Sequence, residues 1–180
     1  EARRATPEKP LVIATGGPLT NVASAWLLAP DIADRVIVSS ILSAGANGWN
    51  DNADAWAKYI VLQRMRSVIL STELRNSEQR KPRLTVEQLL TAMPDTELRR
   101  YMIDRTRAGN DQAIDIASLM VAVRPDLVRQ TRRYSFSHWV PGKPWWSDSH
   151  PEVPVYREDR GGPVTVITEI APRSEFEEEY

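Results

Sequence analysis

Polar and aromatic side chains gather in two short glycine-bearing segments of the sequence. Residues 14–21 read Ala-Thr-Gly-Gly-Pro-Leu-Thr-Asn, and residues 47–54 read Asn-Gly-Trp-Asn-Asp-Asn-Ala-Asp. Glycine lets a backbone approach a ligand closely, asparagine both donates and accepts hydrogen bonds, and an indole offers a flat apolar face. Together these groups suit the binding of sugar hydroxyls and a planar base.

Each segment also has a purely structural interpretation. Residues 14–21 would be a tight strand-to-helix turn with Thr20 or Asn21 as the helix cap, and spacing alone favours that interpretation. In residues 47–54, Asp51 or Asn52 would cap the next helix and Trp49 would cover the core, and here both interpretations stay open. Neither segment is a phosphate-binding loop or a dinucleotide fingerprint, because Gly-Lys-Ser/Thr and GxGxxG are absent.

Asp115 is the third residue whose surroundings suggest chemistry. It lies in the apolar stretch Ile-Asp-Ile-Ala-Ser-Leu-Met-Val of residues 114–121. A carboxylate is costly to bury there unless it is paired, hydrogen-bonded or bound to a metal, and Ca²⁺ accepts carboxylate and carbonyl oxygens. From these residues alone, an aspartate on the helix surface is the preferred interpretation.

An aromatic tail is the last candidate. Residues 134–162 are rich in tryptophan and proline and contain Phe136, Trp139, Trp145 and Trp146. Such side chains can wall a pocket or bind carbohydrate, but more often a loop of this kind is packed by its own side chains. We expect a long structured loop region here.

The elements that position these residues follow from hydrophobic patterning. Apolar runs predict strands at residues 11–15, 36–42, 67–72 and 164–168, and helical spacing predicts helices at 19–28, 53–66, from 85, at 94–103 and 110–123. Alternation of strand and helix predicts an α/β fold, a mostly parallel, Rossmann-like open sheet flanked by helices. Ligands of such sheets bind beyond the carboxyl ends of the strands, so both glycine-bearing segments should reach one crevice.

Composition excludes several classes of protein. A net charge of −1 argues against a nucleic-acid partner, and no apolar run is long enough to predict a membrane span. There is no cysteine, and His138 and His150 are too far apart to suggest zinc. Residues 1–180 are expected to form one domain, and an incomplete one, because the sequence lacks an initiating methionine and its last residues read as the first turn of a helix. Cytoplasmic and, with an upstream signal peptide, secreted or periplasmic locations both stay open.

The order of these motifs resembles the inosine/uridine-preferring nucleoside hydrolase family. In that family a strand ends in Thr-Gly-Pro-Leu-Thr-Asn and continues into a helix, and residues 11–21 reproduce this with one extra glycine. Residues 48–50 stand where the family has Glu-Phe-Asn, and residues 114–116 stand where it has His-Asp-Pro. Residues 160–167 resemble its Arg-Gly-x-Thr-Val strand, so the resemblance covers most of the chain as a carboxyl-terminal half of the family's domain.

The resemblance implies a function and a set of site residues. The Thr15 carbonyl and the Asp115 carboxylate would bind Ca²⁺, and Asn50, Asn47 and Trp49 would bind the substrate. The activity implied is hydrolysis of the N-glycosidic bond of a nucleoside or related glycoside by a Ca²⁺-activated water. The catalytic base would lie in an amino-terminal half that precedes these residues, and that half, with a homo-oligomer, is the partner that the resemblance suggests.

Three departures from the family support a second hypothesis. The Asp-rich amino-terminal motif is absent from these 180 residues, Gly48 stands where the family has a glutamate, and Ile114 stands where it has a histidine. The alternative is therefore a non-catalytic, nucleoside hydrolase-like module that binds a carbohydrate without cleaving it.

Overall fold

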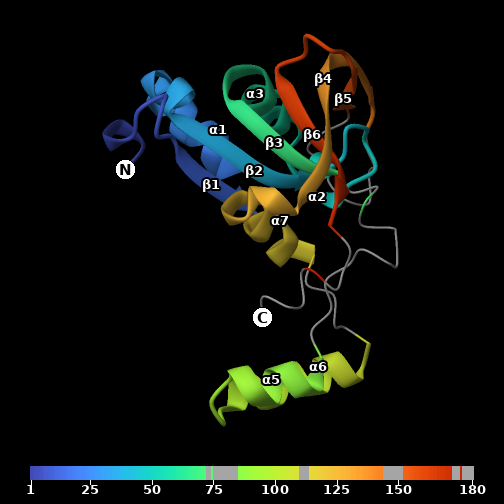
Figure 1. The fold of residues 1–180 in the computed structure, drawn as a ribbon. Coiled ribbons are helices and arrows are strands. Elements are labelled where there is room, and N and C mark those ends of the chain that lie inside the picture. The colour runs from blue at the N-terminus through green and yellow to red at the C-terminus, as the bar shows by residue number, and fades with distance from the viewer. Residues whose placement is uncertain (72–73, 75–84, 110–113, 144–151, 172–174, 176–180) are drawn as a thin grey trace.

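A computed structural model describes residues 1–71, 74, 85–109, 114–143, 152–171 and 175 of the chain (Figure 1), with 114–117 as backbone only. The strands are β1 Leu11–Thr15, β2 Val36–Leu42, β3 Arg66–Ser71, β4 Val128–Pro141, β5 Glu152–Glu158 and β6 Val164–Ile170. The α-helices are α1 Thr20–Leu28, α2 Trp49–Ala53, α3 Ala55–Arg64, α5 Val86–Ala92, α6 Glu97–Arg107 and α7 Ile114–Val123. Short 3₁₀ helices are η1 Ala2–Arg4, η2 Pro30–Arg35 and η4 Pro125–Leu127.

The described strands form one sheet in the order β1-β2-β3-β6-β4-β5. The first four of these are parallel to one another, whereas β4 runs antiparallel to both of its neighbours, β6 and β5. The predicted α/β fold with a mostly parallel sheet is confirmed. Each of the four strands predicted from an apolar run is present, with its ends within two residues of the prediction.

Helices cover both faces of this sheet (Figure 1). α1 and α3 pack on one face, where Val36 and Val38 of β2 are fully buried, and α7 packs on the other. Apolar side chains of β2 therefore enter both cores, as a continuous apolar run predicts for a central parallel strand. Among the described residues, no helix has the length and hydrophobicity needed to cross a membrane.

The loop predicted over residues 134–162 is wrong for residues 134–141 and 152–158, which form strands β4 and β5. Residues from Tyr134 to Pro141 belong to β4 and pair with β5, with Trp139 opposite Pro154. Aromatic side chains fit a strand well, and proline is tolerated in β5 because that strand is at the edge of the sheet. Residues 144–151, including Trp145 and Trp146, lie outside the described residues.

The helical hairpin of α5 and α6 has its own small core. The two helices contact each other, Leu89 and Ile103 are buried, and Figure 1 shows the pair apart from the sheet. Thr85 caps α5 as predicted, since its hydroxyl accepts a hydrogen bond from the Gln88 amide at 3.1 Å. These helices contribute no contact to the carboxyl ends of β1 and β2 in the described part of the chain.

Gly162 lies tightly against the backbone of β4. A Cβ atom at this position would lie 2.2 Å from the carbonyl oxygen of Tyr134, whereas one at Gly161 would have the Asp159 carboxylate at 3.8 Å as its nearest neighbour. We expect Gly162→Ala to lower the free energy of unfolding by about 3 kcal/mol, because backbone must move to admit the methyl group. Gly161→Ala is the matched control and should leave it nearly unchanged in urea denaturation; equal losses would contradict the close approach.

Candidate functional site

Asn50 joins the two glycine-bearing segments at the carboxyl ends of β1 and β2. Its side-chain nitrogen donates hydrogen bonds to the carbonyls of Gly16 and Ile41, each at 3.0 Å. Both partners are acceptors, so the orientation of the amide is determined and both of its hydrogens are used. The predicted convergence of the two segments on one edge is therefore present. A role for Asn50 in ribose binding stays a prediction and would use the amide oxygen.

Two buried hydroxyl groups that have no hydrogen-bond partner among the described residues also lie at the carboxyl ends of β1 and β2. Thr15 of β1 is paired in register with Ser40 of β2, so both side chains point to the same face of the sheet. Neither hydroxyl oxygen has a hydrogen-bond partner among the described residues. Buried polar groups are nearly always satisfied, so this pair is an expected place for a ligand or ordered water. Ser40 was not among the residues predicted from the sequence, although a serine within the apolar run of β2 was a usable signal.

A buried ion pair shapes the loop between β2 and α2. Lys58 Nζ lies 2.9 Å from Asp51 Oδ1, and neither side chain has any exposed area. Asp51 also accepts hydrogen bonds from the Ser43 amide and hydroxyl and from the Gly48 amide, and Lys58 donates to the Gly45 carbonyl at 2.7 Å. Burial lowers the pKa of Lys58, and the attraction of Asp51 opposes that shift. Two charges from α2 and α3 thus hold both halves of the loop.

The side chains of Asn52 and Asp54 also form hydrogen bonds within the protein. The Asn52 amide donates to the carbonyls of Ala46 and Gly48, and its oxygen accepts from the Lys143 amide at 2.8 Å. Asp54 caps α3 and accepts a hydrogen bond of 2.6 Å from Thr20 at the start of α1. These polar residues are structural, as the second interpretation has it, but the residue that caps α3 is Asp54 and not the predicted Asp51 or Asn52.

Trp49 and Asn47 lie at the protein surface beside the carboxyl ends of β1 and β2. Trp49 is the first residue of α2 and is 52% exposed, so the interpretation in which it covers the core is wrong. Asn47 is also exposed in the loop before it. Their predicted contacts with a substrate remain predictions, and their exposure leaves both side chains accessible to one.

Asp115 lies in the first turn of α7, and its side chain is outside the described residues. The Ser118 carbonyl accepts a hydrogen bond from Ser39 in the middle of β2, while Val121 shares a groove with Ile37 at the start of that strand. α7 therefore runs antiparallel to β2, and its first turn lies toward the carboxyl ends of the strands (Figure 1). The backbone of Asp115 is thus on the predicted side of the sheet.

The described residues do not by themselves make a calcium site. They contain no cluster of three histidine, aspartate or glutamate side chains that could hold a metal ion. Asp51 is engaged by Lys58 and three donors, so Thr15 and its neighbours at this edge offer only neutral oxygens. Ca²⁺ takes six to eight oxygen ligands, usually with several carboxylates. The ligand roles predicted for Thr15 and Asp115 stay predictions.

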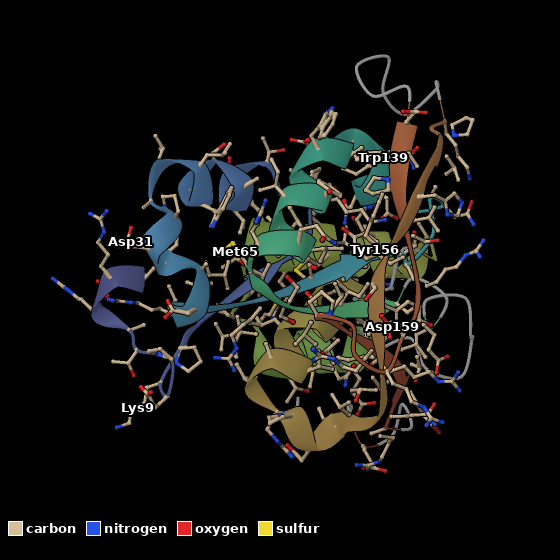
Figure 2. The ribbon with its side chains drawn as sticks, turned by 90° about the horizontal axis from the view of Figure 1, so that it is seen from above. Lys9, Asp31, Met65, Trp139, Tyr156 and Asp159 are labelled. Atoms are coloured by element: carbon tan, nitrogen blue, oxygen red, sulfur yellow. The ribbon has the colours of Figure 1, made fainter. Side chains whose placement is uncertain are left out.

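The aromatic residues of β4 pack on α3. The ring centroids of Trp56 and Trp139 are 4.9 Å apart, and Tyr59 lies 5.2 Å from both Trp139 and Phe136. Figure 2 shows Trp139 and Tyr156 on the side of the β-strands that faces α3. For Phe136 and Trp139, packing is therefore the correct interpretation, although Trp56 remains 58% exposed.

Comparison with known proteins identifies the fold. No protein-family model and no curated protein sequence matches the chain. Three solved structures are similar to it, each over less than three fifths of its own length. An inosine-guanosine nucleoside hydrolase has a TM-score of 0.64 and 18% identity, covering 93% of this chain and 58% of its own. A purine-preferring ribonucleoside hydrolase from Gardnerella vaginalis has a TM-score of 0.65 and 19% identity, covering 93% and 58%.

The third structure is an inosine-uridine preferring nucleoside hydrolase from Bacillus anthracis, with a TM-score of 0.55 and 17% identity, covering 91% of this chain and 56% of its own. At this level of identity the similarity concerns the fold. The fold is nucleoside hydrolase-like, which confirms at the level of the fold the resemblance predicted from the motif order.

The buried ion pair yields a direct test of how the loop is held. Lys58→Met should lower the free energy of unfolding by about 3–5 kcal/mol, because it leaves the Asp51 carboxylate buried without its counter-charge. Arg132→Met is the control, since the ion pair of Arg132 with Glu158 at 2.8 Å is exposed on both sides, and it should leave stability essentially unchanged. Urea denaturation measures both. Similar losses in the two variants would contradict a special role for the buried pair.

Proposed function

We propose that the protein containing this chain hydrolyses the N-glycosidic bond of a nucleoside or related glycoside, with the sugar bound beyond the carboxyl ends of β1 and β2. The observation that carries this proposal is the pair of unpartnered hydroxyls of Thr15 and Ser40, beside two loops that Asn50 joins. The same edge binds ligands in open α/β sheets generally. The nucleoside hydrolase-like fold supports the choice of substrate class.

Each group at this edge has a definite task in the proposal. The hydroxyls of Thr15 and Ser40 and the Asn50 amide oxygen exchange hydrogen bonds with hydroxyls of the sugar. The exposed indole of Trp49 provides a stacking surface for the leaving base, and Asn47 contributes a polar contact on the rim. A sugar held by several fixed groups presents its anomeric carbon in one orientation, which lowers the entropic part of the barrier.

Rigidity of the loop supports the same proposal. The Asp51–Lys58 pair, together with the hydrogen bonds of Asn52, leaves residues 43–48 few alternative conformations. Groups held by buried, fully bonded neighbours keep their geometry when the substrate arrives. The energy of forming this arrangement is spent in folding and not during catalysis.

Calcium and the catalytic base belong to the proposal as well. Ca²⁺ would fix the sugar hydroxyls and lower the pKa of a bound water, with the Thr15 carbonyl and Asp115 among its ligands. The described carboxylates near this edge are engaged elsewhere, so the remaining ligands and the base would come from further sequence. This chain covers 58% of the inosine-guanosine nucleoside hydrolase, which leaves room for such a segment.

A second candidate is a carbohydrate-binding protein with the same fold. Gly48 and Ile114 replace the glutamate and histidine expected from the resemblance, and Trp49 and Trp56 are both more than half exposed. Exposed indoles bind sugar rings without any chemistry. In this alternative the carboxyl edge of the sheet would bind a sugar that is then released unchanged.

The unpartnered hydroxyls permit a sharp test on the complete protein, assayed with inosine, guanosine and uridine for release of free sugar. Ser40→Ala should lower kcat/KM about tenfold while stability is unchanged or improved, because the lost hydroxyl has no partner among the described residues. Ser39→Ala is the matched control: its hydroxyl bonds the Ser118 carbonyl on the opposite face, so stability should fall and kcat/KM should hold.

Chelation separates the two candidate functions. EDTA should abolish sugar release, and added Ca²⁺ should restore it; turnover that survives EDTA would contradict the metal mechanism. Saturable binding of the nucleoside without any sugar release would favour the binding protein. An unchanged kcat/KM in Ser40→Ala would remove that hydroxyl from the site.

A further inference from the structure

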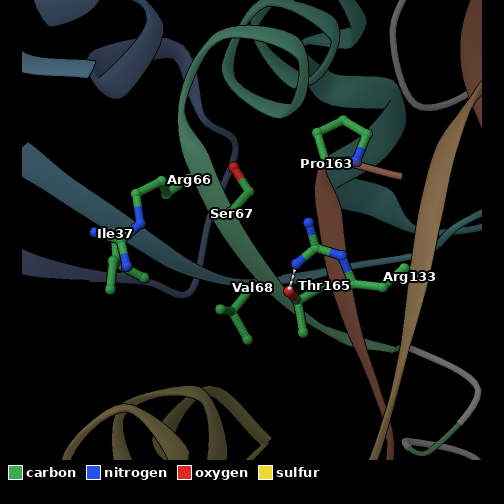
Figure 3. A pocket seen from close by; sticks show the side chains of 7 residues that line it. All are labelled: Ile37, Arg66, Ser67, Val68, Arg133, Pro163 and Thr165. Carbon is green, nitrogen blue, oxygen red and sulfur yellow. Dashed lines mark hydrogen bonds between the residues drawn. The ribbon is translucent and has the colours of Figure 1, made fainter. Parts of the chain in front are cut away.

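A second pocket lies at the opposite edge of the sheet, where β2, β3 and β6 begin. It has a volume of about 200 Å³ and is lined on one side by Arg66 and on the other by Arg133 (Figure 3). The candidate sugar site lies beyond the carboxyl ends of the parallel strands, whereas this pocket lies at their amino ends. The two are therefore separate sites, and the function proposed above does not use this one.

Arg133 is held in one orientation at the pocket. Its Nε donates to the Gly162 carbonyl and its Nη1 to the Thr165 hydroxyl, both at 2.7 Å. Figure 3 shows the guanidinium reaching from β4 across β6 between Pro163 and Thr165, toward the space above β3. A guanidinium has five N–H donors, so several remain for a ligand. Because the side chain is already ordered, binding a ligand costs less conformational entropy.

Arg66 provides a second positive charge from the other wall. It is the first residue of β3, and its guanidinium donates to the Pro7 carbonyl at 3.1 Å. Several arginines elsewhere are paired with acids, such as Arg124 with Asp126 and Arg132 with Glu158. Neither Arg66 nor Arg133 forms an ion pair with a carboxylate in the described part of the chain. The positive charge at this pocket is therefore not neutralised by described neighbours.

The remaining lining strengthens the interaction with an anion. Ile37, Val68 and Pro163 are apolar, and contacts between charges gain strength when apolar walls replace water. The Thr165 hydroxyl accepts its bond from Arg133, so its own hydrogen remains to be donated. Planar guanidinium groups match the oxygens of phosphate and carboxylate.

We propose that this pocket binds a small oxyanion, the phosphate or carboxylate group of a small molecule, with Arg133 as its principal ligand and Arg66 as the second. The volume of the pocket holds one such group with a short substituent. The apolar residues that it shares with the groove beside α7, Ile37 and Val68, place the substituent along that face of the sheet.

Isothermal titration of the protein with inorganic phosphate and, separately, with acetate in a low-salt buffer tests the proposal. Saturable binding at one site is expected with a dissociation constant below about 1 mM for one of the two probes, and the stronger probe identifies the oxyanion class. Arg133→Gln and Arg66→Gln should each weaken that binding about tenfold, the loss expected for a charge-assisted hydrogen bond. Arg132→Gln, which alters the neighbouring paired arginine, should leave it unchanged.

Thermal unfolding of each variant keeps the result interpretable. Arg133 also donates a hydrogen bond to the Gly162 carbonyl, so Arg133→Gln could unfold the protein. In that case Arg66→Gln and the charge-conserving Arg133→Lys test the proposal. Arg133→Lys should bind the oxyanion more weakly, because a single ammonium replaces the planar guanidinium. Absence of saturable binding of either probe up to about 10 mM would overturn the proposal. Equal weakening by Arg132→Gln would overturn it too, because general surface charge would then account for the binding.

Discussion

The buried pair of Asp51 and Lys58 is the constraint on which the candidate site depends. Removing two charges from water is favourable only when every remaining donor and acceptor is satisfied. The pair obtains those partners from Ser43, Gly45 and Gly48, which are spread along the loop after β2. The loop therefore has one well-bonded conformation, and any other would leave a charge buried without a partner. Trp49 and Asn50 follow that loop directly, so their positions are determined by the same pair.

The two ends of the parallel strands lie on opposite sides of the sheet, and in this protein they carry different chemical groups. The carboxyl ends of β1 and β2 carry neutral hydroxyls and amides, held in place by hydrogen bonds such as that of Asn50 with Gly16. The amino ends of β3 and β6 lie beside positive charge, with Arg133 ordered by two hydrogen bonds. Neutral oxygen and amide groups favour a sugar, whereas uncompensated guanidinium groups favour an anion. The strand directions alone place these two chemistries apart.

Local patterns in the sequence predicted local structure well and distant partnerships poorly. β2 was predicted with its correct ends, because a seven-residue apolar run between polar segments has the length of a buried strand and is too short for a buried helix. Lys58 was not singled out from the sequence, and only the tertiary fold shows that it reaches Asp51. The contact of Asn50 with Gly16 spans 34 positions, which no local pattern encodes. The loop predicted over residues 134–162 was wrong for β4 and β5, because tryptophan and proline were together taken as typical of a loop, although aromatic residues fit a strand and an edge strand such as β5 tolerates proline.

Hydrolysis and simple binding of a glycoside differ mainly in whether a free carboxylate is available, and less in the geometry of the site. Either proposed function requires rigidly held groups that can bond sugar hydroxyls, and Thr15, Ser40 and Asn50 are the described residues proposed for that role. Activation of water requires in addition a carboxylate that can take a proton. Asp51 is neutralised by Lys58, and Asp54 is occupied by Thr20 and the start of α3. In the proposed function Thr15, Ser40 and Asn50 would position the sugar, and the base that removes the proton would come from further sequence.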